Sequence, residues 1–191
     1  MKTNIALIGF MGAGKSTVGQ LLAEKLSKQF IEMDSLIEEK AGKSIPEIFQ
    51  QDGETAFREL EIEVTKEVAE RKNAVIACGG GLILNRINID RLKKEGIIVY
   101  LTASPRAILK RVSNEKGQRP LLEGDNPALT IRELLKFRKP FYQRAADITV
   151  NTSKLSVDLI VYEIIRKLKG EQELTPEQKL LRAILIEKGS R

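Results

Sequence analysis

Nine residues close to the start of the chain, GFMGAGKST at positions 9–17, have the types and spacing of a phosphate-binding loop. Gly9, four further residues and Gly14-Lys15-Ser16 fit the pattern G-x-x-x-x-G-K-[ST]. The glycines would let backbone amides face phosphate oxygens, Lys15 would reach the β- and γ-phosphates, and Ser16 would offer its hydroxyl to Mg²⁺. We therefore predict a nucleoside triphosphate site. Its predicted residues are Gly12, Ala13, Gly14, Lys15, Ser16 and Thr17.

Residues 113–128, SNEKGQRPLLEGDNPA, carry glycines, prolines and charges without a sustained period. A stretch of this kind predicts a mobile loop that acts as a lid. Arg119 lies in it and could close over a transferring phosphoryl group, where it would stabilise charge in the transition state and exclude water. A solvated loop arginine is the alternative. The sequence has no guanine-reading N/T-K-x-D motif, which disfavours a regulatory GTPase.

The phosphoryl acceptor needs residues that do not bind phosphate, and Asp34 is the first candidate. It follows the second apolar run of the chain and could orient an acceptor hydroxyl or take its proton. Helix capping is the alternative role. Ser35 with Glu38 has the form of a capping box, which would leave Asp34 available for a ligand.

Two arginines could also face the acceptor. Arg58 lies one position off the apolar stripe of its predicted helix and could bind a carboxylate in a bidentate manner. An ion pair with Glu54 or Glu61 at helical spacing is the alternative, and the two roles are compatible. Arg138 precedes Pro140, which should distort its helix and could turn the arginine inward. Considered alone, Arg138 fits the outer face of a basic helix slightly better.

Three glycines, Gly79, Gly80 and Gly81, end the third apolar run. The absence of side chains there would let a ligand approach the backbone. A flexible turn accounts for one glycine more readily than for three. For Cys78, directly before them, we expect a small, buried and inert side chain, with a reactive thiol as the alternative.

The elements that must position these residues follow from five apolar runs that alternate with helical patterns. This alternation predicts an α/β doubly wound domain whose ligands bind at the carboxyl ends of parallel strands. The runs are 4–8, 30–33, 74–78, 97–101 and 147–150. The helical stripes are Val18, Leu21, Leu22 and Leu26, and Phe57, Leu60, Val64 and Val68. Ser104-Pro105 and the pair Thr130 with Glu133 predict two further helix starts.

The chain of 191 residues suits a single domain, which we place at residues 1–170. Residues 171–191 predict an added C-terminal helix, because Thr175 and Pro176 are good starting residues. The net charge of +6 is dispersed, which suits small anionic ligands better than nucleic acid. The absence of histidine excludes Ser-His-Asp and Cys-His catalysis. A lone cysteine and the lack of a membrane-spanning run lead us to expect a cytoplasmic monomer without a membrane partner.

Taken in order, the motifs resemble the shikimate kinase family from about residue 3 to residue 169. The matching stretches are GFMGAGKST, Glu32-Met33-Asp34, FRELE at 57–61, CGGG at 78–81, QRPLL at 118–122 and RKPFY at 138–142. The resemblance implies a P-loop domain of the nucleoside-monophosphate-kinase-like fold, with three layers and five parallel strands in the order 2-3-1-4-5. It also implies that ATP, with Mg²⁺, phosphorylates the 3-hydroxyl of shikimate on the route to chorismate and the aromatic amino acids.

The resemblance implies a role for each matching residue on the acceptor side. Asp34 would hold the ring hydroxyls and be the candidate base, and Arg58 and Arg138 would bind the carboxylate. The glycine run would add a backbone contact, best placed at Gly80.

On the ATP side, Lys15 and Arg119 would stabilise the transferring phosphoryl group. The adenine contacts would fall near Arg111 and in the turn at Ser153 and Lys154. Ser16 and Glu32 would hold Mg²⁺. Family members commonly have Asp at the position of Glu32, so this longer side chain would reach the metal either directly or through water.

Two other classes of function stay open from the sequence. One is a different small-molecule kinase of the same fold, such as a gluconate kinase or a nucleotide kinase. A nucleotide acceptor would need a base pocket and more arginines, whereas Arg58 and Arg138 around an aspartate suit a hydroxylated acid better. The other class is a nucleotide-dependent switch without turnover, against which the lid and the acceptor residues argue.

Overall fold

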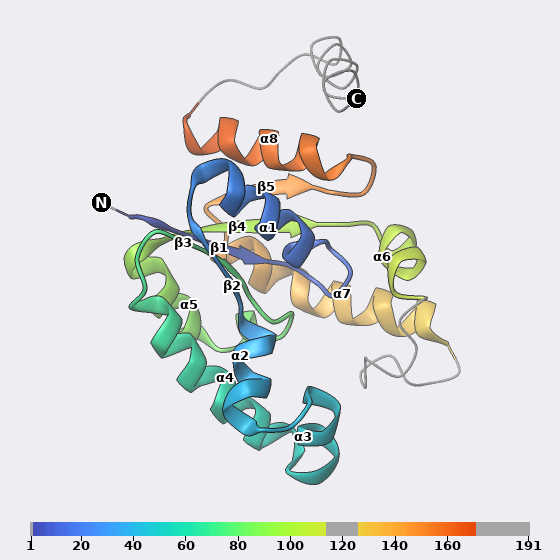
Figure 1. The fold of residues 1–191 in the computed structure, drawn as a ribbon. Helices are drawn as coiled ribbons and strands as arrows, with labels where there is room; N and C mark the ends of the chain where they lie inside the picture. Colours follow the sequence, from blue (N-terminus) through green and yellow to red (C-terminus); the bar gives the residue numbers. More distant parts are fainter. Residues whose placement is uncertain (1, 114–125, 171–191) are drawn as a thin grey trace.

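The computed structural model describes residues 2–113 and 126–170, which form a parallel sheet covered by helices on both faces (Figure 1). The strand order is β2-β3-β1-β4-β5, as the resemblance implied, and every neighbouring pair is parallel. The strands are β1 (Asn4–Ile8), β2 (Gln29–Glu32), β3 (Ala74–Ala77), β4 (Gly96–Thr102) and β5 (Ile148–Asn151). The predicted fold class is therefore confirmed.

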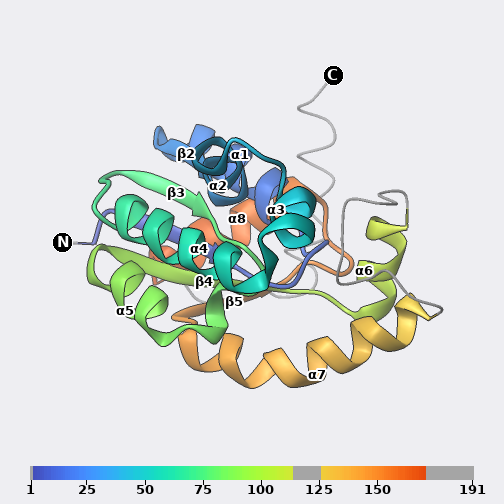
Figure 2. The same ribbon diagram turned by 90° about the horizontal axis from the view of Figure 1, so that it is seen from below.

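The helices follow the strands in the alternation that the sequence predicts. They are α1 (Lys15–Leu26), α2 (Met33–Ala41), α3 (Ile45–Gln51), α4 (Gly53–Ala69), η1 (Leu82–Leu84), α5 (Arg86–Glu95), α6 (Pro105–Val112), α7 (Pro127–Ala145) and α8 (Val157–Leu168). Seen from below in Figure 2, α4 and α5 lie in front of the sheet, on the face opposite α1 and α8.

Alternate side chains of the strands divide the core between the two faces of the sheet. Ala6 and Ile8 of β1 pack with residues of α4, α5 and α7, whereas Ile5 and Leu7 pack with residues of α1 and α8. Both faces are apolar, which explains the near-continuous apolar runs of the sequence. A third, smaller cluster around Phe10 and Ile108 joins the phosphate-binding loop to α6 and α7.

Two of the predicted helix starts are wrong. α2 begins at Met33, directly at the end of β2, so Ser35 lies exposed inside its first turn and caps nothing. The Glu38 carboxylate instead accepts a hydrogen bond from the Ile45 amide at 2.9 Å. The capping box of this region is Ser44 with Glu47, at the start of α3.

The second wrong start is Thr130 with Glu133. Asn126 caps α7 earlier by accepting from the Leu129 amide at 3.1 Å, and Pro127 occupies the first helical position. Ser104-Pro105 is confirmed, because the Ser104 hydroxyl accepts from the Ala107 amide at the start of α6.

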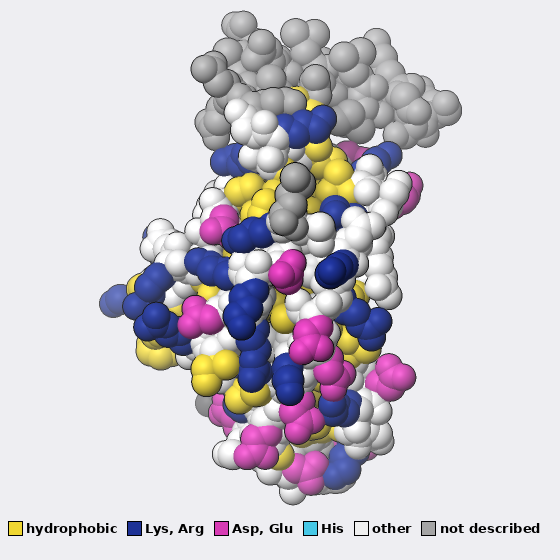
Figure 3. Space-filling view, turned by 90° about the vertical axis from the view of Figure 1, so that its left-hand side faces the viewer, with side chains coloured by type: hydrophobic (Ala, Val, Ile, Leu, Met, Phe, Trp, Pro, Cys, Tyr) yellow, Lys and Arg dark blue, Asp and Glu magenta, His cyan; other side chains and the backbone are white. Residues whose placement is uncertain are grey.

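The predicted lid, including Arg119, falls largely on residues 114–125, and the predicted C-terminal helix falls on residues 171–191. Both lie outside the described residues and stay predictions. Within the described part of the chain, no helix combines the length and the apolar character needed to cross a membrane. On the face shown in Figure 3, Lys and Arg side chains share the surface with Asp and Glu side chains.

Candidate active site

A cavity of about 800 Å³ brings most of the predicted site residues together. Its walls are the segments that follow β1, β2 and β3, together with side chains from α3, α4, α6 and α7. The predicted residues that line it are Gly12, Gly14, Lys15, Ser16, Thr17, Glu32, Asp34, Arg58, Gly79, Gly80, Gly81, Arg111 and Arg138. Among the predicted residues that the structure describes, the buried Ala13, the half-buried Ser153 and the exposed Lys154 do not line this cavity.

The phosphate-binding loop has the backbone that its glycines predict. Gly12 and Gly14 have φ angles of 70° and 95°, a left-handed conformation that other residues rarely adopt. α1 begins at Lys15, immediately after Gly14, so its N-terminal amides and partial positive charge lie at the loop. The Lys15 ammonium donates to the carbonyl oxygens of Gly9 at 3.1 Å and Phe10 at 3.3 Å. The loop is therefore arranged for an anionic ligand.

Two side chains bind the carbonyl groups on the other side of this loop. Arg111 of α6 donates to the Gly12 carbonyl at 2.9 Å and to the Thr152 carbonyl at 2.6 Å. The buried Thr152 hydroxyl lies 3.0 Å from the Ala13 carbonyl oxygen and donates to it. Because these carbonyls are engaged, the orientation of the loop peptides is fixed. Arg111, predicted to contact adenine, thus also supports the phosphate-binding loop.

Ser16 and Glu32 offer oxygen atoms that suit a magnesium ion. Burial raises the pKa of Glu32; a hydrogen bond from Ser16 lowers it, nearby Asp34 raises it and Lys15 lowers it. A cation beside these oxygens would favour the ionised carboxylate. The described residues contain no group of three or more His, Cys, Asp or Glu side chains that could hold a metal.

Arg58 is held by two glutamates of its own helix, so the predicted ion pairs are both present. Its guanidinium donates to Glu54 at 2.9 Å and to Glu61 at 3.2 Å. Glu61 is buried, which raises the pKa of its carboxyl, while the charge of Arg58 lowers it. Its Oε1 has no hydrogen-bond partner among the described residues. A buried carboxylate therefore faces the cavity beside Arg58.

The glycine run fits closely against the acceptor side chains. A Cβ atom at Gly81 would lie 2.6 Å from an Arg58 guanidinium nitrogen. A Cβ atom at Gly79 would lie 3.1 Å from Glu61 Oε1 and 3.2 Å from Asp34 Oδ1. The glycines at 79 and 81 thus leave room for neighbouring side chains, a reason that the sequence interpretation did not give.

Arg138 is buried, so the interpretation that places it on the outer face of its helix is wrong. α7 runs through Pro140, and Arg138 shares its buried face with Ile131, Tyr142 and Ala145. The guanidinium lies 5.7 Å from the centre of the Phe10 ring and donates weakly to the Gly80 carbonyl at 3.4 Å. The helix face, rather than the proline, turns Arg138 toward the cavity.

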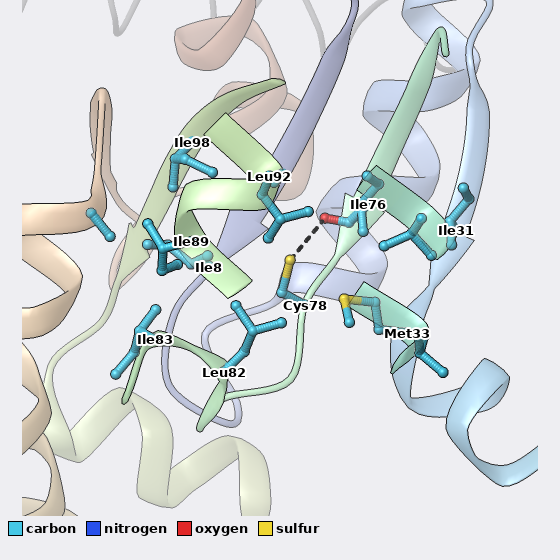
Figure 4. Close-up of a cluster of buried hydrophobic side chains, with 14 of the residues drawn as sticks. Ile8, Ile31, Met33, Ile76, Cys78, Leu82, Ile83, Ile89, Leu92 and Ile98 are labelled. Atoms are coloured by element: carbon cyan, nitrogen blue, oxygen red, sulfur yellow. Dashed lines mark hydrogen bonds between the residues drawn. The ribbon is translucent and has the colours of Figure 1, made fainter. Parts of the chain in front are cut away.

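Cys78 lies in the core beneath the cavity, among the apolar side chains drawn in Figure 4. It is buried, its Sγ lies 3.8 Å from the Ile76 carbonyl oxygen, and burial raises the pKa of its thiol. A thiol in this environment stays protonated and out of reach of solvent, which favours the inert role.

The sequence interpretation missed one wall of the cavity. Ile45, Pro46 and Phe49 come from α3, and Phe57 from α4, where it packs on Phe49 with ring centres 4.8 Å apart. The signal for α3 was present, because Ser44-Ile45-Pro46-Glu47 is a capping box with proline in the first turn. Its place over the cavity depends on the packing of α3 against α4, which no local pattern encodes.

Comparison with known proteins decides which family this site belongs to. The family model described as shikimate kinase matches residues 11–169. The chain belongs to the shikimate kinase family. A shikimate kinase of Caldanaerobacter subterraneus subsp. tengcongensis is 47% identical over 170 residues, which cover 87% of this chain and 98% of the relative. One of Nitrosococcus oceani is 38% identical over 187 residues, 98% of each chain, so that match extends into residues 171–191.

Solved structures agree with this membership. The shikimate kinase of Acinetobacter baumannii in complex with shikimate has a TM-score of 0.85 and 40% identity, over 89% of this chain and 94% of the other. A gluconokinase of Sinorhizobium meliloti reaches a TM-score of 0.55 with 18% identity, over 88% of this chain and 94% of the other. The gluconokinase shares the fold alone.

Proposed function

We propose that this site transfers the γ-phosphoryl group of ATP to the 3-hydroxyl of shikimate. The observation that carries the proposal is the convergence of a phosphate-binding loop, one aspartate and two arginines on a single cavity, in a chain of the shikimate kinase family. A ring acid with several hydroxyls needs both a cationic grip and a hydroxyl acceptor, and the cavity offers both.

ATP would bind with its phosphates at the amides of the loop 12–17 and at Lys15. Ser16 and Glu32 would hold Mg²⁺, which supplies neutralisation of charge on the β- and γ-phosphates when bound. Arg111 would lie beside the adenine while it holds the loop, and the exposed Lys154 would contribute at most from the edge. Arg119 would close over the transferring group, a role that rests on the resemblance.

Shikimate would bind with its carboxylate between Arg58 and Arg138, and with its ring hydroxyls at Asp34. Glu54 and Glu61 support this placement, because they fix the direction of the Arg58 guanidinium. Gly79, Gly80 and Gly81 would form the floor beneath the ring. The hydroxyl held by Asp34 would then face the γ-phosphorus for in-line attack.

The chemistry asks little of the protein beyond position and charge. Asp34 would orient the attacking hydroxyl and accept its proton as the bond to phosphorus forms and the bond to ADP breaks. Lys15, Arg119 and the loop amides would stabilise the charge that develops on the phosphoryl oxygens. This mechanism needs no histidine, in agreement with a chain that has none.

The partners in this proposal are ATP and shikimate alone. We place the protein in the cytoplasm as a monomer; its single cysteine is free and buried, which suits a reducing compartment. Sedimentation of the purified protein with and without ATP tests the monomer.

The test of the proposed function is ADP release from Mg-ATP with shikimate, quinate, gluconate or nucleoside monophosphates as the acceptor. Turnover with shikimate far above the others supports the proposal. Turnover with another acceptor would keep the phosphate-binding loop and remove the roles of Asp34, Arg58 and Arg138. ATP binding without turnover on any acceptor would favour a nucleotide-dependent switch.

A further inference from the structure

Tyr142 carries a hydroxyl that is fully buried directly beneath the glycine run. It donates to the Gly80 carbonyl oxygen at 2.6 Å, and its ring stacks on Tyr100 with centres 4.8 Å apart and planes 8° apart. Burial raises the pKa of Tyr142, so its oxygen keeps its proton and stays a donor. Tyr142 is the last residue of the stretch RKPFY at 138–142.

The bond from Tyr142 fixes more than one carbonyl. The described residues contain no cis peptide bond, and in a trans peptide the C=O of one residue and the N–H of the next point in opposite directions. When the Gly80 carbonyl points at Tyr142, the Gly81 N–H must therefore point away from it. Gly80 and Gly81 both line the cavity.

The Arg138 guanidinium contacts the same carbonyl as the Tyr142 hydroxyl. The Arg138 guanidinium contacts the Gly80 carbonyl only at 3.4 Å, and its Nε has no hydrogen-bond partner among the described residues. Arg138 lies close enough for its charge to lower the pKa of Tyr142, against the effect of burial. The Gly80 carbonyl, held by the Tyr142 hydroxyl, thus lies beside two possible donors to a ligand, the Arg138 guanidinium and the Gly81 N–H.

We propose that Tyr142 is a positioning residue for the carboxylate of the acceptor, acting through the Gly80–Gly81 peptide and the Arg138 guanidinium. The role rests on the proposed function, since it requires a carboxylate-bearing acceptor. Without the hydroxyl, the Gly80 carbonyl keeps only the weak contact from Arg138, so the Gly80–Gly81 peptide is held less firmly and the acceptor binds more weakly. Bound ATP is unaffected, because Tyr142 touches no residue of the loop 12–17 in any hydrogen bond of the described chain.

The test compares Tyr142→Phe with Tyr100→Phe. Both variants remove one hydroxyl from the same stacked pair, but Tyr100 bonds Thr102 and not Gly80. We expect Tyr142→Phe to raise the KM for shikimate about three- to tenfold, with the ATP KM and kcat nearly unchanged. Tyr100→Phe should leave all three constants near the wild-type values. An unchanged shikimate KM in Tyr142→Phe, or an equal rise in both variants, would overturn the role.

A second readout isolates the carboxylate. The wild-type protein should prefer shikimate over its methyl ester, and Tyr142→Phe should lose part of that preference because only the carboxylate contact is weakened. An undiminished preference contradicts the role. If the wild-type protein turns over no shikimate, the proposed function fails and this role fails with it. If the wild-type protein turns over shikimate and the Tyr142→Phe variant does so equally well, the role of Tyr142 fails and the proposed function stands.

Glycine labelled with ¹⁵N gives a measurement that does not depend on folding of the variant. In the wild-type protein, saturating shikimate should shift the Gly81 amide resonance more than those of Gly42 and Gly53, which do not line the cavity. A Gly81 resonance that moves no more than these controls would contradict the proposed orientation of the peptide.

Discussion

Replacing Gly81 by alanine tests whether the glycine is needed to make room for the Arg58 side chain, which is proposed to bind the acceptor. Gly81 has φ −95° and ψ −13°, which alanine adopts without strain, so the backbone should tolerate the change. The added Cβ would lie 2.6 Å and 2.8 Å from the two terminal nitrogens of Arg58 and 3.1 Å from its guanidinium carbon. Ordinary contact begins at 3.4 Å, so the nearest nitrogen must retreat by about 0.8 Å.

A shift of this size is enough to break a directed hydrogen bond to the acceptor, whereas the protein should stay folded. The Arg58 side chain is long and a quarter exposed, so its guanidinium can shift within its two ion pairs without unpacking the core. A hydrogen bond to a charged group contributes about 1.5–3 kcal/mol, which corresponds to an affinity loss of roughly 10- to 150-fold. We expect Gly81→Ala to raise the shikimate KM within this range and to leave ADP affinity and the melting temperature nearly unchanged.

Gly80→Ala is the matched control. A Cβ atom there would meet the Met11 amide nitrogen at 3.5 Å as its nearest neighbour, an ordinary contact. Gly79→Ala should be intermediate, with contacts of 3.1 Å to Glu61 and 3.2 Å to Asp34. Steady-state KM values for both substrates, calorimetric ADP binding and thermal unfolding check the series. If Gly80→Ala loses as much shikimate affinity as Gly81→Ala, the glycines serve the approach of the ligand and the argument from Arg58 is refuted.

Three further predictions concern the two substrates and the C-terminal residues. Arg58→Ala and Arg138→Ala should each raise the shikimate KM at least about tenfold in steady-state kinetics, because a charged hydrogen bond is lost, and should leave ATP binding intact. An equal loss of affinity for both substrates would contradict the assignment. Thr152→Val should raise the KM for ATP severalfold, because the Ala13 carbonyl loses its donor, and Thr152→Ser should restore it; a change confined to the shikimate KM would count against this reason. Removal of residues 171–191 should leave kcat and both KM values largely unchanged; loss of turnover in a truncated protein that still shows cooperative unfolding would assign those residues to the site.

The parts of the fold that the sequence predicts are those in which the cause is local. The phosphate-binding loop needs glycines at left-handed positions, and these can be found from their spacing alone. The strands are recognisable because both faces of the sheet are buried, so β1 falls on the predicted residues and the ends of the others differ by at most one residue.

Helix starts failed where two signals competed within a few residues. Ser35 with Glu38 has the right spacing, but β2 passes into α2 without a loop, so the helix has begun before Ser35 is reached. At α7, Asn126-Pro127 caps the helix ahead of Thr130. A capping pattern shows that a side chain could cap a helix, and the preceding backbone decides whether it does.

The acceptor side of the site was the hardest to predict because its residues act through one another. Arg58 and Arg138 were identified as residue types that bind carboxylates, and the ion pairs of Arg58 were predicted, yet the contacts of both arginines with the glycine run join residues distant in the chain. Gly81 makes room for Arg58, and the Gly80 carbonyl receives both Arg138 and Tyr142. These contacts join residues far apart in the chain, so no periodicity or spacing in the sequence predicts them. What the glycine run does, therefore, follows from the side chains packed against it, and the Gly79, Gly80 and Gly81 substitutions separate those effects position by position.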